Sequence, residues 1–291
     1  MSRALQAVVV LCLLVLVAAG GVLVVRSTRQ QPADTATPPP NEVVVLAPCG
    51  FNTPVTVVAN LFRKAHREIK LEVVMDNANV LVNKVQAGKL TGDAFMSPGE
   101  TEMKLLVDSG HIDPSTITDW GSLDMVVIAS LKARGVKTIA DLALPSVRYI
   151  ALPDPRLTSV GYYGEKALKA LGLYDRIKGK LVTPDGILKA VELVETGDAD
   201  AGLAYLTCPL ETNPEKASKS ALRIVETIPR DKYPPVRLQA GMFKTARNNA
   251  AAQEFFDFLS TKEAQDALAA NGVLTLEGRR SGGSAALESI R

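Results

Sequence analysis

The stretch Val43–Thr56 reads VVVLAPCGFNTPVT and joins a predicted strand to a predicted helix. The apolar run Val43–Ala47 is typical of a buried β-strand. The triplet Asn52-Thr53-Pro54 then predicts a helix start, because Thr is a good N-cap and Pro suits the first helical position. Such a strand–loop–helix junction leaves unpaired backbone N–H groups at the start of the helix, and these groups attract anions.

The same kind of junction is predicted at three further places. Asn77 or Asn79 can cap a second helix, Thr158 or Ser159 a third, and the pair Thr183-Pro184 a fourth. Capped helices are common in α/β proteins, so each junction alone means little. Four of them, spread over both halves of the chain, modestly favour a protein that binds an anion in a cleft.

Strands and helices alternate along the chain. Further strands are predicted at 71–75, 94–96, 125–129, 149–152 and 201–205. Helices are predicted at 54–66, 80–87, 100–109, 160–171, 186–195, 250–259 and 262–270. This rhythm predicts an α/β architecture with mostly parallel sheets, in which ligands bind beyond the carboxyl ends of the strands.

The N-terminus carries a long apolar run. Ala7–Val25 holds nineteen residues without a charge, close to the ~20 that a helix needs to cross a bilayer. A signal peptide cleaved after Ala19 is the alternative, but the run continues past that point, so a transmembrane signal-anchor over residues 1–26 is favoured. The Pro-rich segment 27–42 is typical of a linker. Either alternative places the remainder on the extracytoplasmic, periplasmic side of the membrane.

The composition is that of a globular protein. Apolar residues make up 47% and charged residues 22% of the 291, with a formal net charge of +2. This balance predicts no binding to nucleic acid, and an aromatic content of 5% is low for stacking on bases. A cysteine hydrolase would need a histidine base beside its thiol, and His66 and His111 are predicted on the surface, so no enzyme is expected.

Three long stretches carry a resemblance to a known family. They are IALPDPRLTSVGYYGEKALKALGLYDRIKGKLV from Ile150, GILKAVELVETGDADAGLAYLTC from Gly186 and AAQEFFDFLSTKEAQDALAANGV from Ala251. With the opening stretch, they resemble the periplasmic molybdate-binding proteins of ABC transporters, which have a two-lobed class II solute-binding fold. The resemblance extends from about Glu42 to Thr275.

The resemblance implies two lobes joined by crossovers near Leu123–Met125 and Leu238–Ala240. Lobe 1 would consist of residues 43–123 and 240–291, and lobe 2 of residues 124–239. The implied function is that of an ABC-importer receptor, which closes about a hinge on a molybdate- or tungstate-like oxyanion. It would then dock, as a monomer, on a membrane permease. No cofactor is expected, and no metal other than the one within such an oxyanion.

The resemblance also implies the ligand contacts, which fall on Gly50, Ala78, Val160, Ile187 and Tyr205. Val160 and Ile187 would donate backbone N–H groups, and Tyr205 its hydroxyl. The family has serines where this chain has glycine and alanine, and each lost hydrogen bond to a charged group costs ~1.5–3 kcal/mol. Neighbouring residues that could substitute are Asn52, Thr53, Asn77 and Asn79.

A site rewritten in one lobe leaves two hypotheses. The first is the importer receptor described above. The alternative is a degenerate solute-binding-like sensory or interaction domain, tethered to the membrane, with altered or no oxyanion binding. Cys49 and Cys208 are expected at the edge of the cleft, one in each lobe. A disulfide and a soft-metal pair stay open for them, but two buried, unreactive thiols are favoured.

Overall fold

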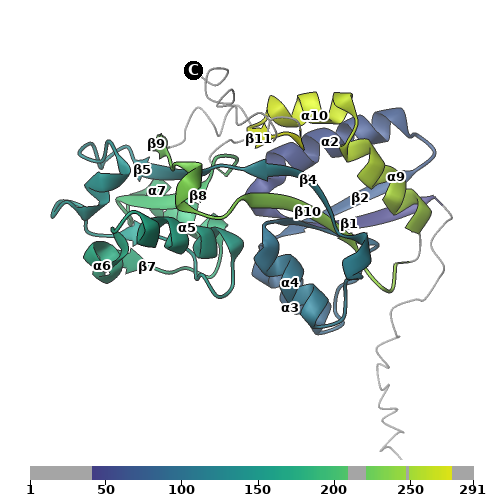
Figure 1. The fold of residues 1–291 in the computed structure, drawn as a ribbon, viewed down its shortest axis with the longest axis horizontal. Helices are drawn as coiled ribbons and strands as arrows, with labels where there is room; N and C mark the ends of the chain where they lie inside the picture. The colour runs from purple at the N-terminus through teal and green to yellow at the C-terminus, as the bar shows by residue number, and fades with distance from the viewer. Residues whose placement is uncertain (1–40, 209–220, 247–248, 277–291) are drawn as a thin grey trace, which may run out of the picture. The chain divides into compact units, whose positions relative to one another are not determined.

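The computed structural model describes residues 41–208, 221–246 and 249–276, all within one compact unit, Pro38–Arg291. They form two lobes, each built around its own sheet (Figure 1). The predicted α/β architecture is confirmed. The prediction of mostly parallel sheets is wrong, because each sheet combines parallel with antiparallel pairs.

Lobe 1 contains the six-stranded sheet. Its strands in spatial order are β11 (Val273–Leu274), β4 (Thr118–Leu123), β10 (Val236–Met242), β3 (Ala94–Pro98), β1 (Glu42–Pro48) and β2 (Lys70–Asp76). β1 pairs in parallel with β2 and β3. β10 runs antiparallel to both β3 and β4, because β4 leads towards the other lobe and β10 returns from it.

Helices cover both faces of this sheet. They are α2 (Asn52–Ala65), α3 (Ala78–Gln86), α4 (Glu100–Asp108), α9 (Asn249–Leu259) and α10 (Lys262–Ala269). Along β1, Val45 and Ala47 pack into one hydrophobic cluster and Leu46 into another, as the alternation of side chains in a strand requires. The helices α2, α9 and α10 lie on one face, and α3 and α4 on the other (Figure 1).

Lobe 2 contains the five-stranded sheet. Its strands in spatial order are β7 (Leu181–Val182), β6 (Ile150–Ala151), β8 (Ala201–Tyr205), β5 (Met125–Ser130) and β9 (Leu222–Thr227). Its helices are α5 (Ser159–Ala170), α6 (Tyr174–Ile177) and α7 (Ile187–Thr196). The strands β5, β6 and β8 and both long helices match the predictions, whereas β7 and β9, like β4, β10 and β11 in lobe 1, were not predicted. Short 3-10 turns occur at Cys49–Phe51 (η1), Pro114–Thr116 (η2), Ile139–Ala143 (η3), Lys178–Lys180 (η4) and Arg230–Lys232 (η5).

Two chain segments connect the lobes. The first passes from β4 to β5 at Asp124, within the crossover predicted at Leu123–Met125. The second runs from β9 to β10, so the crossover predicted at Leu238–Ala240 lies inside a strand of the first sheet. Residues 236–239, predicted in lobe 2, therefore pair with the strands of lobe 1.

Two helix starts differ from their predictions. The η1 turn runs directly into α2, so Phe51 rather than Thr53 precedes the first helical residue, and Pro54 lies in the first turn. The N-cap of α7 is Gly186 rather than Thr183. The carbonyl of Pro184 accepts from the Asp154 N–H at 3.1 Å, which keeps the chain outside the helix until that point.

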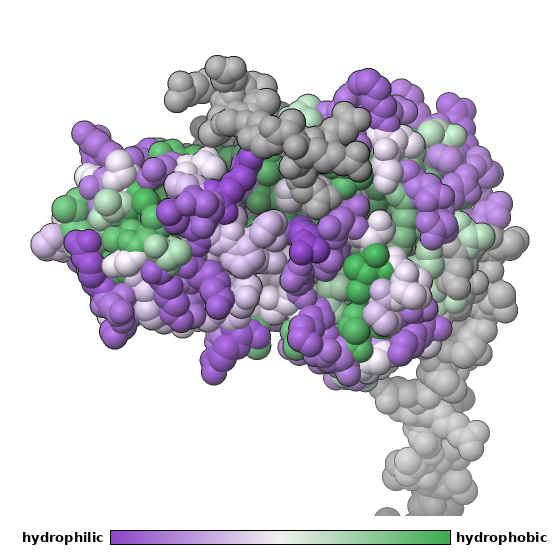
Figure 2. All heavy atoms as spheres, in the orientation of Figure 1, coloured by the Kyte–Doolittle hydropathy of each residue, from purple (hydrophilic) through white to green (hydrophobic). Residues whose placement is uncertain are grey.

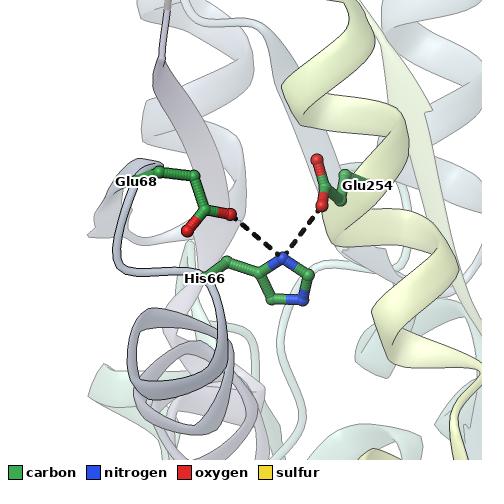
Figure 3. Close-up of side chains that lie close together, drawn as sticks. All are labelled: His66, Glu68 and Glu254. Carbon is green, nitrogen blue, oxygen red and sulfur yellow. Dashed lines mark ion pairs between the residues drawn. The ribbon is translucent and has the colours of Figure 1, made fainter.

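Ion pairs tie distant elements together at two places. At the end of α2, His66 stacks on Phe62 with ring centroids 4.4 Å apart, and its Nδ1 lies 2.9 Å from the carboxylate of Glu254 on α9 and 3.6 Å from that of Glu68 (Figure 3). The second pair joins the two connections between the lobes. The Arg230 guanidinium donates to both carboxylate oxygens of Asp124, at 2.7 and 2.9 Å.

No helix in the described part of the chain is long and apolar enough to cross a membrane. The predicted signal-anchor, residues 1–26, and residues 27–40 of the predicted linker lie outside that part, so both stay predictions. Glu42, placed in the linker, is the first residue of β1. On the face shown in Figure 2, hydrophilic residues are spread over both lobes, with hydrophobic residues between them.

Replacing Arg230 with methionine is expected to lower the free energy of unfolding by about 3 kcal/mol, because the Asp124 side chain is only 5% exposed and would lose its partner. Arg237→Met is the matched control. Its partners Glu100 and Asp119 are 54% and 28% exposed, so its loss is expected to cost less than ~1 kcal/mol. Urea unfolding of both variants measures the difference. Equal losses would contradict this role for the Asp124–Arg230 pair.

Candidate functional site

A small cavity lies between the lobes. It is lined by Pro48, Gly50, Ala78, Pro98, Glu102, Thr158, Val160, Gly186, Ile187 and Tyr205. The centre of a water molecule can move within a volume of about 20 Å³, and one water needs ~10–15 Å³ by the same measure. A sphere of that volume, enlarged by the ~1.4 Å radius of water, gives a cavity roughly 3 Å in radius. It can hold a single compact ligand of a few atoms.

The five residues predicted as ligand contacts all line this cavity. They are Gly50, Ala78, Val160, Ile187 and Tyr205. They come from five separate elements: η1, α3, α5, α7 and β8. The structure therefore brings together residues from 50 to 205 of the chain, although ligand contact by each of them stays a prediction.

None of the four predicted substitutes is among the lining residues. Instead, Asn52 accepts a hydrogen bond from Thr56, Asn79 accepts from the Val80 N–H, and Thr53 is buried in α2. The Asn77 side chain accepts from the Cys49 thiol at 3.6 Å. A Cβ added to Gly50 would lie 3.4 Å from Ile187 Cγ2, an ordinary contact, so space alone does not force the loss of a serine there.

Helix starts supply the polar wall of the cavity. Ala78 and Ile187 are the first residues of α3 and α7, and Val160 is the second residue of α5. The first backbone N–H groups of a helix have no partner within the helix and carry partial positive charge. Of the predicted side-chain caps, Thr158 is confirmed, because its hydroxyl accepts from the Gly161 N–H. The starts of three helices thus surround one small space with backbone N–H groups, which carry partial positive charge but no formal charge.

Glu102 is the functional candidate that sequence reasoning missed. It lies in the first turn of α4, where an acidic residue normally faces solvent and complements the helix dipole, yet it is only 2% exposed. Its Oε1 accepts from the Ser159 N–H at 2.8 Å, and its Oε2 accepts a very short hydrogen bond from the Ser159 hydroxyl. Burial raises the pKa of Glu102, and the two bonds from Ser159 oppose that rise. The signal in the sequence was its spacing of four residues from the apolar Leu106, which places both side chains on the same, buried face of the helix.

Hydrogen bonds join the lobes all around the cavity. The Tyr205 hydroxyl donates to the Pro98 carbonyl at 2.8 Å, and the Thr207 hydroxyl donates to the Gly50 carbonyl at 3.1 Å. The Thr101 N–H donates to the Ser159 hydroxyl at 3.2 Å. The lobes are therefore in direct contact, and the Tyr205 hydroxyl that was expected to reach a ligand is engaged with the opposite lobe.

Both cysteines of the cleft are free thiols. Cys208 donates to the Gly50 carbonyl at 3.1 Å. Burial raises the pKa of Cys49 to about 11 and that of Cys208 to about 12, so neither forms a nucleophilic thiolate at neutral pH. This agrees with the favoured interpretation of two unreactive thiols.

Two lobes, two crossovers and a small cavity between them are the architecture of a solute-binding protein. The family model for bacterial extracellular solute-binding proteins matches residues 43–274, and the chain belongs to this family. The predicted resemblance is thereby confirmed, and an extracellular family agrees with the predicted location.

Relatives of known name add detail. YvgL of Bacillus subtilis, named as an ABC transporter substrate-binding lipoprotein, is 28% identical over 204 residues, which cover 70% of this chain and 75% of YvgL. The molybdate-binding protein ModA of Rhodobacter capsulatus is 23% identical, over 80% of this chain and 88% of ModA. In structure, the periplasmic molybdate-binding protein of Azotobacter vinelandii matches with a TM-score of 0.66 and 20% identity, over 80% of this chain and 98% of that one.

The chain is therefore a solute-binding protein of the bacterial extracellular family. Its relatives are transport proteins rather than enzymes, in line with the expectation that it catalyses no reaction. The comparisons lend no support to the alternative of a degenerate sensory or interaction domain.

Ionisation of Glu102 is expected to destabilise the protein. A raised folded-state pKa means that the folded protein holds this proton more tightly than the unfolded chain. The stability that protonated Glu102 contributes is complete below its ordinary pKa of 4.5 and is lost as the pH rises through its folded-state pKa. Glu102→Gln removes this titration. The difference between the melting temperature of the variant and that of the unmodified protein should therefore grow in favour of the variant from pH 5 to pH 8.

Glu100→Gln is the control for this measurement, because Glu100 is on the same helix turn but 54% exposed. Its melting temperature should follow that of the unmodified protein at both pH values. A Glu102→Gln curve that runs parallel to the unmodified one would disprove the prediction.

Proposed function

We propose that this protein is the receptor of an ABC importer and binds one tetrahedral oxyanion between its lobes. The observation that carries the proposal is the convergence of the starts of α3, α5 and α7 on one cavity with room roughly 3 Å in radius. A buried anion must have its charge satisfied by hydrogen bonds, and backbone N–H groups at helix starts do this without a cation. A tetrahedral oxyanion of molybdate, tungstate, sulfate or phosphate matches both the size and the donors.

Binding would work by hinge closure. In the described part of the chain, two segments join the lobes. The Asp124–Arg230 pair holds these two segments together. The hydrogen bonds between Tyr205 and Pro98 and between Thr207 and Gly50 would belong to the closed arrangement. Opening would break them and expose the cavity, and a ligand that bridges both lobes would favour closure.

A membrane permease is the partner that this function requires. The name of YvgL supports it, since it describes a substrate-binding lipoprotein of an ABC transporter. The closed monomer would deliver the anion to the permease on the extracytoplasmic side, either anchored by the apolar N-terminal segment or released after cleavage.

Isothermal titration of the purified protein with molybdate, tungstate, sulfate and phosphate tests the proposal. At least one of the four is expected to bind with one anion per chain, because the cavity holds a single compact ligand. The bound anion should also add about 2.7 kcal/mol to the free energy of unfolding at a hundredfold excess over the Kd, and so raise the melting temperature. No heat and no stabilisation with any of the four would refute an oxyanion receptor.

The closed contact can be tested separately at Gly186. A Cβ there would lie 2.7 Å from Asn77 Oδ1 on the opposite lobe, so Gly186→Ala should hold the lobes apart. An overpacked contact of this kind costs roughly 1–3 kcal/mol, so the bound anion should be held about tenfold more weakly. The fold of each lobe should be unaffected, since the φ of −162° at this position suits any residue.

The double variant Gly186→Ala, Asn77→Ala supplies the control. It removes the amide that the added methyl group meets and should restore most of the lost affinity. An affinity that stays low in the double variant would mean that the alanine acts on α7 itself and not on closure.

A further inference from the structure

Among the described residues that line the cavity, only Glu102 carries a carboxylate. The other nine lining residues include no acid, lysine, arginine or histidine. Helix starts favour an anion in this space, whereas a carboxylate within its wall opposes one. The repulsion between like charges is several times stronger in a buried site than in water, because the local dielectric is lower. An anion and the Glu102 carboxylate can share this space only if a proton lies between them, carried either by the anion or by Glu102.

The surroundings of Glu102 supply hydrogen bonds but no neutralising cation. From α5, the Ser159 N–H and hydroxyl donate to it. The hydroxyls of Tyr163 on α5 and Tyr205 on β8 lie near enough to interact with its carboxylate electrostatically. On its own helix, Glu100 points outward and pairs with Arg237 at 3.4 Å. Within the described residues, no ion pair joins Glu102 to a basic side chain.

The neighbouring titratable groups are themselves neutral. Burial raises the pKa of Tyr163, Tyr205 and Cys208, so these groups keep their protons at neutral pH. Both tyrosine hydroxyls are engaged, Tyr163 with the Glu100 N–H at 3.4 Å and Tyr205 with the Pro98 carbonyl at 2.8 Å. None of them supplies the missing positive charge. A carboxylate has about four lone-pair positions, so the two bonds from Ser159 leave it able to accept one more.

We infer that Glu102 determines the specificity of this site: it accepts a hydrogen bond from an oxyanion that carries a proton, and it disfavours oxyanions that carry none. The inference rests on the proposed function and names the ligand class within it. Phosphate and related acids keep an O–H group at neutral pH, which donates directly to the carboxylate. Sulfate and molybdate are fully ionised there, so they would have to take up one proton from the solution to occupy the same site.

Titrations at pH 7.5 with sodium phosphate, sulfate and molybdate test this in three forms of the full chain. The unmodified protein should bind phosphate at least tenfold more tightly than the other two. Glu102→Gln keeps the shape and one acceptor oxygen for Ser159 but not the charge, so the preference should shrink to within threefold. Glu100→Gln, which removes one negative charge from the same turn outside the cavity, should behave as the unmodified protein.

A second measurement needs no variant and so does not depend on the folding of Glu102→Gln. Titration of the unmodified protein in two buffers of different ionisation enthalpy counts the protons taken up. Sulfate or molybdate, where binding is measurable, is expected to take up more protons than phosphate, up to one per anion, because any Glu102 that is ionised in the free protein must be neutralised first.

The outcomes separate the two proposals. An unchanged preference in Glu102→Gln overturns the role of Glu102, as does tight binding of sulfate or molybdate without proton uptake, while either leaves the oxyanion receptor standing. If none of the three anions binds the unmodified protein or Glu102→Gln, the oxyanion receptor itself fails and this inference with it.

Discussion

The cost of burying charge governs the centre of this molecule. The cavity lies between two lobes, and none of the described residues that line it is basic. Any charge within it must therefore be satisfied by hydrogen bonds from the protein. The starts of α3, α5 and α7 supply these bonds, and the rest of the fold holds the three starts in place. The parallel strands of each sheet end at the cavity, and the helices that follow them begin there.

The same constraint explains the contact between Glu102 and Ser159. The first N–H of α5 already has an acceptor, and this acceptor comes from the other lobe. The protein thus satisfies part of its electropositive wall with its own carboxylate, which also joins the lobes. A ligand enters a site whose charge has been partly balanced in advance, and this makes the protonation of both partners part of recognition.

Local sequence was sufficient for most single elements. The apolar run Val43–Ala47 predicted β1, and the helix predicted at 186–195 corresponds to α7, which Gly197 ends with a left-handed φ of 80°. Resemblance, rather than spacing, placed Tyr205 and Ile187 together, because their meeting depends on the connections between strands. The mixed sheets were missed for the same reason: the direction of β10 is set by its return from lobe 2, which no local pattern records. Thr53 failed as a cap because the preceding 3-10 turn extends the helix backwards. Glu102 was missed because its burial comes from α5, fifty-seven positions further along the chain.

The small size of the cavity has a kinetic consequence. A ligand that fills a space roughly 3 Å in radius would touch both lobes while the hydrogen bonds between Tyr205 and Pro98 and between Thr207 and Gly50 persist. If hinge closure holds the ligand as proposed, its release requires those bonds to break, and the lifetime of the complex is limited by the protein's own opening rate. Ligands of different affinity would then share an upper limit to their dissociation rate, and a permease that pries the lobes apart would accelerate the departure of all of them alike.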